Sequence, residues 1–203
     1  MPTPPRIDRV IELQKLLLQF RAIKRMIYLP GKLSQKENDV EHSYDLAMAS
    51  WFLAEYFPEL NKDKIIRMCL AHDLTEVHAG DTFAYGQAKH IASKQERERI
   101  AADKLAVDWK DFPDLHATIE EYEARSSREA CFVYALDKIM PALMNLLGDG
   151  YAWHKHHITL ADFRAEKEHK VAHSPEILGY YHQLYDLLKS RPDLLPLQKP
   201  TPR

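Results

Sequence analysis

Apolar residues recur every three to four positions along most of this chain, which is the spacing of one face of an α-helix. Glycine is scarce, with 6 residues in all, and convincing two-residue hairpin signals are absent. The pattern therefore predicts an all-α fold. The predicted helices cover residues 7–27, 39–56, 63–76, 89–107, 115–124, 127–148, 160–171 and 176–188. Pro30-Gly31 predicts the end of the first helix, and a polar loop is expected from there to residue 38.

No repeat, low-complexity block or linker interrupts this pattern, so residues 1–203 are predicted to form a single domain built as a helical bundle. The predicted core covers about residues 16–158, and the C-terminal helices cover about residues 160–188. The Pro-rich tail, residues 192–203, is expected to fray or to lie over the surface.

Composition narrows the function class. The chain carries 28 Lys and Arg against 30 Asp and Glu, for a formal net charge of -2, so no global basic field exists to hold long nucleic acid. A small anionic substrate needs only a few local cations. Cys69 and Cys131 lie within apolar helical runs, which indicates reduced thiols. No signal peptide is visible, and a cytoplasmic location is expected.

The longest apolar run covers residues 130–147 and contains Asp137, Lys138, Pro141 and Asn145. These polar and helix-bending residues favour a buried core helix over a membrane span. Asp137 is the single polar residue on a helical face that is otherwise apolar. Burial of an unpaired carboxylate there would cost several kcal/mol, so Asp137 needs a cation as its partner. That cation is either a metal ion or a buried Arg or Lys.

Three further residues favour the metal. His72-Asp73 falls near the end of a predicted helix, where two adjacent side chains can turn toward one ion, and His42 falls in the first turn of another. Together with Asp137 they form the pattern H…HD…D. This mixed nitrogen and oxygen set suits one divalent ion that activates water. Glu76 and Asp81 add two acids within nine residues of the pair. The alternative is that these two acids face solvent and cap neighbouring helices.

These segments resemble the HD-domain metal-dependent phosphohydrolases, and look closest to the branch of YfbR-like 5′-deoxynucleotidases. The resemblance runs from about residue 16 to residue 158. Its most specific part is the run HDxxEVxxGD, here His72 to Asp81. Two further stretches match, namely Glu37-Asn38-Asp39-Val40-Glu41-His42-Ser43 and residues 129–145 around Asp137.

The resemblance implies a single HD domain that holds one divalent metal ion, for which Mn, Co, Ni, Fe, Zn and Mg are all candidates. The implied metal ligands are His42, His72, Asp73 and Asp137. Glu76 and Asp81 are implied to be catalytic or substrate-positioning acids, and Arg25 is implied to hold the substrate phosphate. One acid would align the attacking water and the other would protonate the leaving 5′-oxygen, and the two roles are exchangeable.

The function implied is removal of phosphate from ribo- or deoxyribonucleoside 5′-monophosphates. The alternatives are hydrolysis of another small phosphate ester or of a nucleotide triphosphate, and a non-catalytic sensor that binds a metal or nucleotide. The expected partner is a small-molecule nucleotide or phosphate ester, with no long nucleic acid and no membrane. A homodimer is also possible, because Trp51, Trp109 and Tyr180-Tyr181 read as apolar residues on exposed faces.

Overall fold

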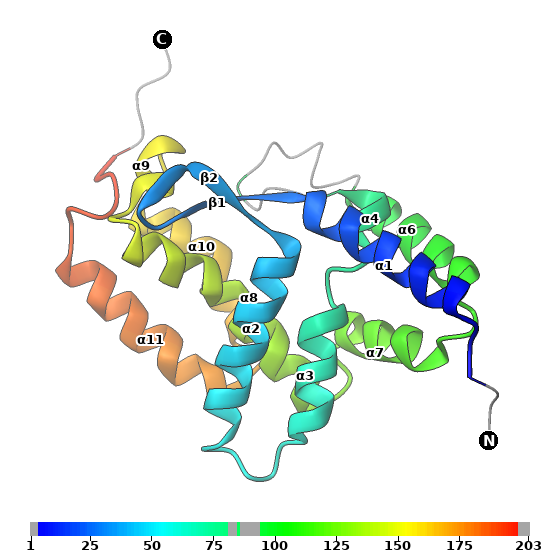
Figure 1. The fold of residues 1–203 in the computed structure, drawn as a ribbon. Coiled ribbons are helices and arrows are strands. Elements are labelled where there is room, and N and C mark those ends of the chain that lie inside the picture. Colours follow the sequence, from blue (N-terminus) through cyan, green and yellow to red (C-terminus); the bar gives the residue numbers. More distant parts are fainter. Residues whose placement is uncertain (1–3, 81–84, 86–93, 199–203) are drawn as a thin grey trace.

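The computed structural model of this chain describes residues 4–80, 85 and 94–198, and it describes residues 94 and 95 by their backbone alone. Within these residues the fold is built from helices, with a single two-stranded sheet (Figure 1). The prediction of an all-α fold is therefore confirmed. The predicted boundaries of the secondary-structure elements are wrong mainly near the N-terminus, where the two-stranded sheet lies.

That sheet is a hairpin directly after the first helix. Helix α1 (Ile7–Ala22) ends before β1 (Lys24–Leu29), which pairs antiparallel with β2 (Lys32–Asn38). Leu29 lies opposite Lys32, so Pro30 and Gly31 form the turn, with Gly31 at a φ of 72°. The helix predicted for residues 7–27 is therefore wrong beyond residue 22, and the loop predicted to residue 38 is wrong. Because most of β2 is exposed and polar, it shows no apolar alternation to reveal a strand.

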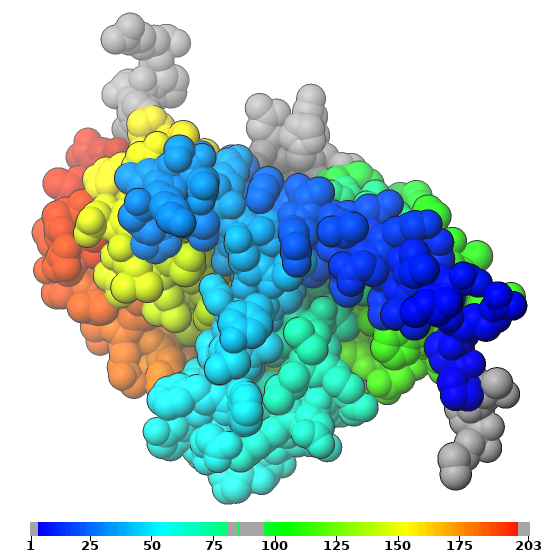
Figure 2. Space-filling model, in the orientation of Figure 1, coloured from blue at the N-terminus to red at the C-terminus, as the bar shows by residue number. Residues whose placement is uncertain are grey.

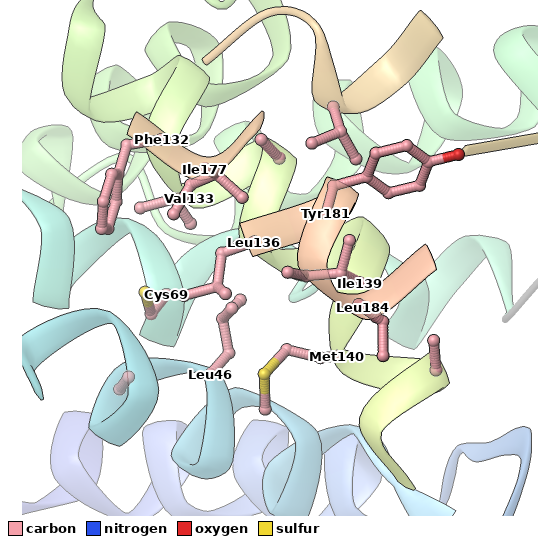
Figure 3. Close-up of a cluster of buried hydrophobic side chains, with 14 of the residues drawn as sticks. Leu46, Cys69, Phe132, Val133, Leu136, Ile139, Met140, Ile177, Tyr181 and Leu184 are labelled. Carbon is pink, nitrogen blue, oxygen red and sulfur yellow. The ribbon is translucent and has the colours of Figure 1, made fainter. Parts of the chain in front are cut away.

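Helix α8 (Arg128–Leu147) is the centre of the larger hydrophobic core. It packs against α2 (Asp39–Ala54), α3 (Lys62–Ala71), α10 (Leu160–Val171) and α11 (Pro175–Ser190). Figure 3 shows Leu136 of α8 near Cys69 of α3 and Leu46 of α2, and Ile139 of α8 beside Leu184 of α11. By length and composition α8 could cross a bilayer, but 56% of its most apolar window is buried inside the protein. It is therefore a core helix, as its internal polar residues predict.

The smaller core cluster joins α1 to the end of α3, to α6 (Lys94–Asp108) and to α7 (Pro113–Ala124). Partly buried residues of α2 and of α4 (Glu76–Ala79) pack against it. Leu16, Phe20 and Trp109 are among its buried members. Trp109 is 7% exposed, and Tyr181 in the larger core is 1% exposed, so both were wrongly expected on exposed faces. Trp51 is half-exposed, as predicted.

The C-terminal segment is part of the core. Leu194 and Leu195 are 1% and 4% exposed, so this part of the predicted tail does not fray. The Leu194 backbone lies against Gly150, where a Cβ atom would come 1.9 Å from the Leu194 carbonyl oxygen. Gly150 precedes the short helix α9 (Tyr151–Lys155), which was not predicted. Helix α10 begins and ends as predicted, since a capping box between Thr159 and Asp162 fixes its start.

Candidate metal centre

His42 enters the site because the start of α2 is fixed by its sequence. The Asn38 side chain accepts from the backbone N–H groups of Val40 and Glu41, and the Glu41 side chain returns to the Asn38 N–H. This capping box places His42 in the first turn, where it is 1% exposed. Its Nε2 lies 2.9 Å from Asp137 Oδ1, and its Nδ1 lies 3.8 Å from Glu37 Oε2. One ring nitrogen therefore faces the centre and the other faces a supporting carboxylate.

His72 and Asp73 lie where α3 ends. His72 is the C-cap residue, and its Nδ1 lies 3.0 Å from the Cys69 carbonyl oxygen. Because a carbonyl can only accept, Nδ1 carries a proton, which leaves Nε2 as the ring nitrogen that can present a lone pair to a metal ion. His72 Nε2 is buried and has no hydrogen-bond partner among the described residues, although Asp73 Oδ2 lies 3.0 Å away. Two acceptor atoms that approach in this way suit a shared cation.

Asp137 lies on the buried face of α8, and its two oxygens have different neighbours. Oδ1 faces His42 and lies 3.9 Å from His72 Nε2. Oδ2 accepts from the Tyr122 hydroxyl at 3.3 Å and pairs with the Lys138 ammonium. The sequence allowed either a metal ion or a basic side chain as the partner of Asp137, and the geometry is compatible with both. A lysine holds one oxygen, and the other oxygen remains directed at the histidines.

Arg25 reaches the same site from β1 and lies among carboxylates. Its side chain is 13% exposed, and one guanidinium nitrogen lies 2.7 Å from Asp73 Oδ2 and 3.4 Å from Asp39 Oδ1. Its Nε lies 3.4 Å from Glu37, and another nitrogen lies 4.0 Å from Asp137. Sequence reasoning did not assign Glu37 and Asp39 to the site. The available signal was their position in the matched stretch before His42.

The charges hold these carboxylates ionised. Burial alone would raise the pKa of Asp73, but His72 and Arg25 hold it well below its usual range. Burial would likewise raise the pKa of Asp137, and Lys138 and His42 hold it well below 3.8. For His42, burial and Arg25 lower the pKa, but hydrogen bonds to Asp137 and Glu37 raise it to about 9. A metal ion that binds here must therefore displace a proton from His42.

The donor set fits a divalent ion. One ligand atom each from His42, His72 and Asp73 lies within 4.8 Å of the others, and Asp137 approaches both histidines. Ion-to-ligand bonds of about 2.0 to 2.2 Å bring neighbouring donors to such separations. The unpartnered His72 nitrogen is the atom that most needs a cation. The structure thus brings the four predicted ligands together.

Of the two predicted catalytic acids, Glu76 is described and Asp81 lies outside the described residues. Glu76 is the first residue of α4 and is half-buried. A carboxylate oxygen of Glu76 lies within 4.8 Å of oxygens from Asp39 and Asp73. Glu76 therefore faces the centre. This position is where an acid could exchange a proton with a group bound there.

Comparison with known proteins gives concordant matches. Residues 17–178 match a family model described as HD domain. The chain is 28% identical to 5′-deoxynucleotidase HDDC2 of Xenopus laevis over 181 residues, which cover 87% of this chain and 86% of that protein. It is 28% identical to the human protein of that name over 134 residues, covering 64% and 63% respectively.

A solved structure agrees with these sequence matches. The crystal structure of a protein described as a predicted metal-dependent phosphohydrolase, from Magnetospirillum magnetotacticum MS-1, superposes with a TM-score of 0.77. The two chains are 32% identical, and the match covers 93% of this chain and 99% of the other.

Proposed function

This chain belongs to the HD-domain family, and we propose that it removes the 5′-phosphate from nucleoside monophosphates, with a preference for deoxyribonucleotides. Membership makes it a metal-dependent phosphohydrolase that acts on a small-molecule nucleotide. The convergence of His42, His72 and Asp73 around a buried nitrogen lone pair is the observation that carries the proposal. The name shared by the vertebrate relatives supports the substrate.

In the proposed site one divalent ion is held by His42, His72, Asp73 and Asp137. When bound, such an ion lowers the pKa of water and polarises a phosphoryl oxygen. Neighbouring side chains and a backbone carbonyl orient the ligands. Tyr122 and Lys138 fix the outer oxygen of Asp137, and Cys69 fixes the tautomer of His72, so these ligands stay oriented.

Glu76 and Asp81 are the proposed proton-transfer residues. Glu76 faces Asp39 and Asp73 at short range, so it lies where an acid could donate a proton to a leaving oxygen. Asp81 would then align the attacking water, and the reverse assignment remains equally open. Arg25, which already bridges Asp73 and Asp39, is proposed to turn part of its guanidinium toward the substrate phosphate.

We also propose self-association through the outer face of α2. Four large side chains recur on this face and Tyr56 follows in the turn after the helix, and each of the five is 46% to 63% exposed, namely Tyr44, Met48, Trp51, Phe52 and Tyr56. Helix α2 lies at the molecular surface beside α1 and the hairpin (Figure 2). A patch of this kind is typical of protein interfaces. Phe52→Glu should shift a dimer to a monomer in sedimentation velocity, whereas a monomeric wild type would contradict the proposal.

We propose a cytoplasmic location because both cysteines are free thiols. Cys69 and Cys131 are both free, and Cys69 is buried at the α2–α3 contact. Free thiols persist in a reducing compartment. Fractionation of cells that produce the protein would test this.

The test of the proposed activity is phosphate release from a panel of ribo- and deoxyribonucleoside 5′-monophosphates. Chelator-stripped protein receives one divalent metal at a time. Asp137→Asn removes a proposed ligand, and Asp149→Asn is the matched control, because the same chemical change falls on an exposed residue just beyond α8. Metal-dependent release that is lost only in Asp137→Asn supports the proposal. Equal release from both sugars removes the deoxy preference. No release despite stoichiometric metal binding contradicts the activity.

A further inference from the structure

Glu37 is a buried acid that contacts two groups of the site without being a proposed metal ligand. It is 2% exposed. Its Oε2 lies 3.4 Å from Arg25 Nε and 3.8 Å from His42 Nδ1, and these are the basic groups within 4.0 Å of that oxygen among the described residues. The oxygen is shielded from water and forms no hydrogen bond with a described residue. Its charge therefore depends on Arg25 and His42 for compensation.

The backbone at Glu37 is fixed on both sides. Glu37 is the penultimate residue of β2, and Asn38 after it lies opposite Lys24 in the hairpin. Asn38 is also the N-cap of α2, where the capping box with Glu41 fixes the first turn of the helix. The chain therefore passes from a paired strand directly into a capped helix. A side chain at this junction has the rigid support that a positioning residue needs.

Glu37 favours one tautomer of His42. An ionised carboxylate can only accept a hydrogen, so its charge favours the tautomer with the proton on Nδ1. Nε2, which lies 2.9 Å from Asp137 Oδ1, is then the nitrogen that can present a lone pair to a metal ion. A separation of 3.8 Å is longer than a hydrogen bond, so the carboxylate acts on the ring through its charge. Carboxylates behind metal-binding histidines fix the tautomer and the orientation of the ring.

The same oxygen of Glu37 also orients Arg25. It approaches Nε, on the stem side of the guanidinium, so the two terminal nitrogens extend toward the centre. One terminal nitrogen lies 2.7 Å from Asp73 Oδ2, and the other lies 4.0 Å from Asp137 Oδ1. The terminal nitrogens form the fork with which an arginine binds a phosphate. Glu37 therefore directs this fork toward the position of the proposed metal ion.

We propose that Glu37 is a positioning residue of the active site, in which one carboxylate oxygen orients His42 for the metal ion and Arg25 for the phosphate. This inference rests on the proposed function, because it takes a metal ion and a phosphate ester as the ligands. Asp137 also approaches both His42 and Arg25, but it is itself a proposed metal ligand. Loss of the Glu37 charge should therefore weaken the binding of the metal ion and of phosphate together.

The first test measures Co²⁺ binding to chelator-stripped protein by isothermal titration calorimetry and by the visible absorption spectrum of the bound ion. Glu37→Gln keeps the size of the side chain and removes its charge. Glu176→Gln is the matched control, because it makes the same change at a carboxylate that is 7% exposed and pairs with Arg128. Glu37→Gln should lose at least about tenfold in Co²⁺ affinity and alter the spectrum, whereas Glu176→Gln should change neither. Wild-type affinity and spectrum in folded Glu37→Gln would overturn the inference.

The second test concerns Arg25 and uses inorganic phosphate as the probe. Phosphate is titrated into protein that is already saturated with Co²⁺, so a weaker metal site does not obscure the result. Its affinity should fall several-fold in Glu37→Gln and stay unchanged in Glu176→Gln, because only the first variant releases the Arg25 fork. Wild-type phosphate affinity in Glu37→Gln would overturn the part of the inference that concerns Arg25.

Glu37→Asp separates the charge of Glu37 from its shape. This variant keeps the charge but withdraws it by one methylene, so its Co²⁺ affinity should lie between those of the wild type and Glu37→Gln. Weaker binding in Glu37→Asp than in Glu37→Gln would show that shape decides, and would overturn the inference. If Glu37→Gln does not fold, Glu37→Asp replaces it, and wild-type Co²⁺ affinity in that folded variant would contradict the proposed role.

Neither titration requires turnover, so the two proposals can fail separately. Co²⁺ binding that depends on Glu37, in a protein that hydrolyses no nucleotide, would support this inference and contradict only the proposed activity. Nucleotide hydrolysis by the wild type, together with unchanged Co²⁺ and phosphate affinities in Glu37→Gln, would contradict only this inference.

Discussion

On the hairpin side of the site one guanidinium lies among three carboxylates, whereas on the α8 side one ammonium group pairs with one carboxylate. Arg25 lies among Glu37, Asp39 and Asp73, and Lys138 pairs with Asp137. The histidines lie between the two sides. The excess of acid on the first side favours a divalent cation, whereas the charges of the ion pair on the second side balance. The site therefore needs its added positive charge on the hairpin side.

Removal of Arg25 should break this arrangement most severely. In Arg25→Met the acids of the hairpin side lose their cation, and breaking a buried pair in this way costs about 3 to 5 kcal/mol. Urea unfolding of metal-free protein, followed by circular dichroism, should report a loss of that order. Arg164→Met, which removes an exposed pair with Glu168, should have little effect on stability. Equal losses in the two variants would mean that the acids do not depend on Arg25.

Removal of the metal should have the next largest effect. An ion present at about 100 times its dissociation constant stabilises the folded chain by about 2.7 kcal/mol. A chelator should therefore lower the melting temperature of the wild type by several degrees. The Asp137→Asn variant supplies the control, since a protein that binds no ion should melt at one temperature with or without chelator. A chelator effect that persists in this variant would place the ion elsewhere.

The burial of Lys167 should make the stability of the protein depend on pH. The pKa of Lys167 is about 8 in the folded chain against 10.5 for an unperturbed lysine. Below pH 8 the lysine is charged in both states and the folded chain bears the full penalty of burying it. As the pH rises through 8, the folded chain releases the proton and the penalty falls. Between pH 7 and 9 the wild type should gain about 1.5 kcal/mol relative to Lys167→Met, measured by urea unfolding. A flat difference would show that the charge is compensated.

The hairpin turn should give the smallest effect. Gly31 adopts a φ of 72°, so Gly31→Ala should cost about 1 kcal/mol and lower the melting temperature slightly. Gly179→Ala makes the same change inside α11, where a Cβ would meet nothing within 4 Å and helix propensity favours alanine. That control should melt higher than the wild type. A loss of activity in Gly31→Ala without a loss of stability would show that the turn positions Arg25 closely.

Much of the helical fold, and the convergence of the four proposed metal ligands, could be predicted from the sequence. Asp137 was visible because a carboxylate on an apolar helical face demands a partner, and its convergence with His42 and His72 followed the matched pattern. The hairpin could not be predicted, because an exposed polar strand has no periodic signal. The helical extent of the chain was readable where caps such as Thr159 and Asn38 fix the ends.

Lys167 illustrates what the sequence hides. The stretch Phe-Arg-Ala-Glu-Lys-Glu-His-Lys-Val, residues 163–171, reads as a charged, solvated helix. Only the packing of α10 on α8 shows that one of its lysines is buried while its neighbours remain in partial contact with water. The side-chain contacts of Arg25 were hidden for a related reason. They depend on the pairing of two strands that sequence reasoning did not expect.

The contact between Leu194 and Gly150 has a consequence for how the chain can be shortened. A fragment trimmed to residues 17–178, the extent of the family match, would lose Tyr181, Leu184 and Leu188 together with the closing leucines at 194 and 195. The flank of α8 that these residues cover would then face water, and such a fragment would be prone to aggregate. Any truncated version meant for crystallisation or labelling should therefore continue through residue 195, with tags added after it. Gly150 itself tolerates no side chain as long as that segment is in place.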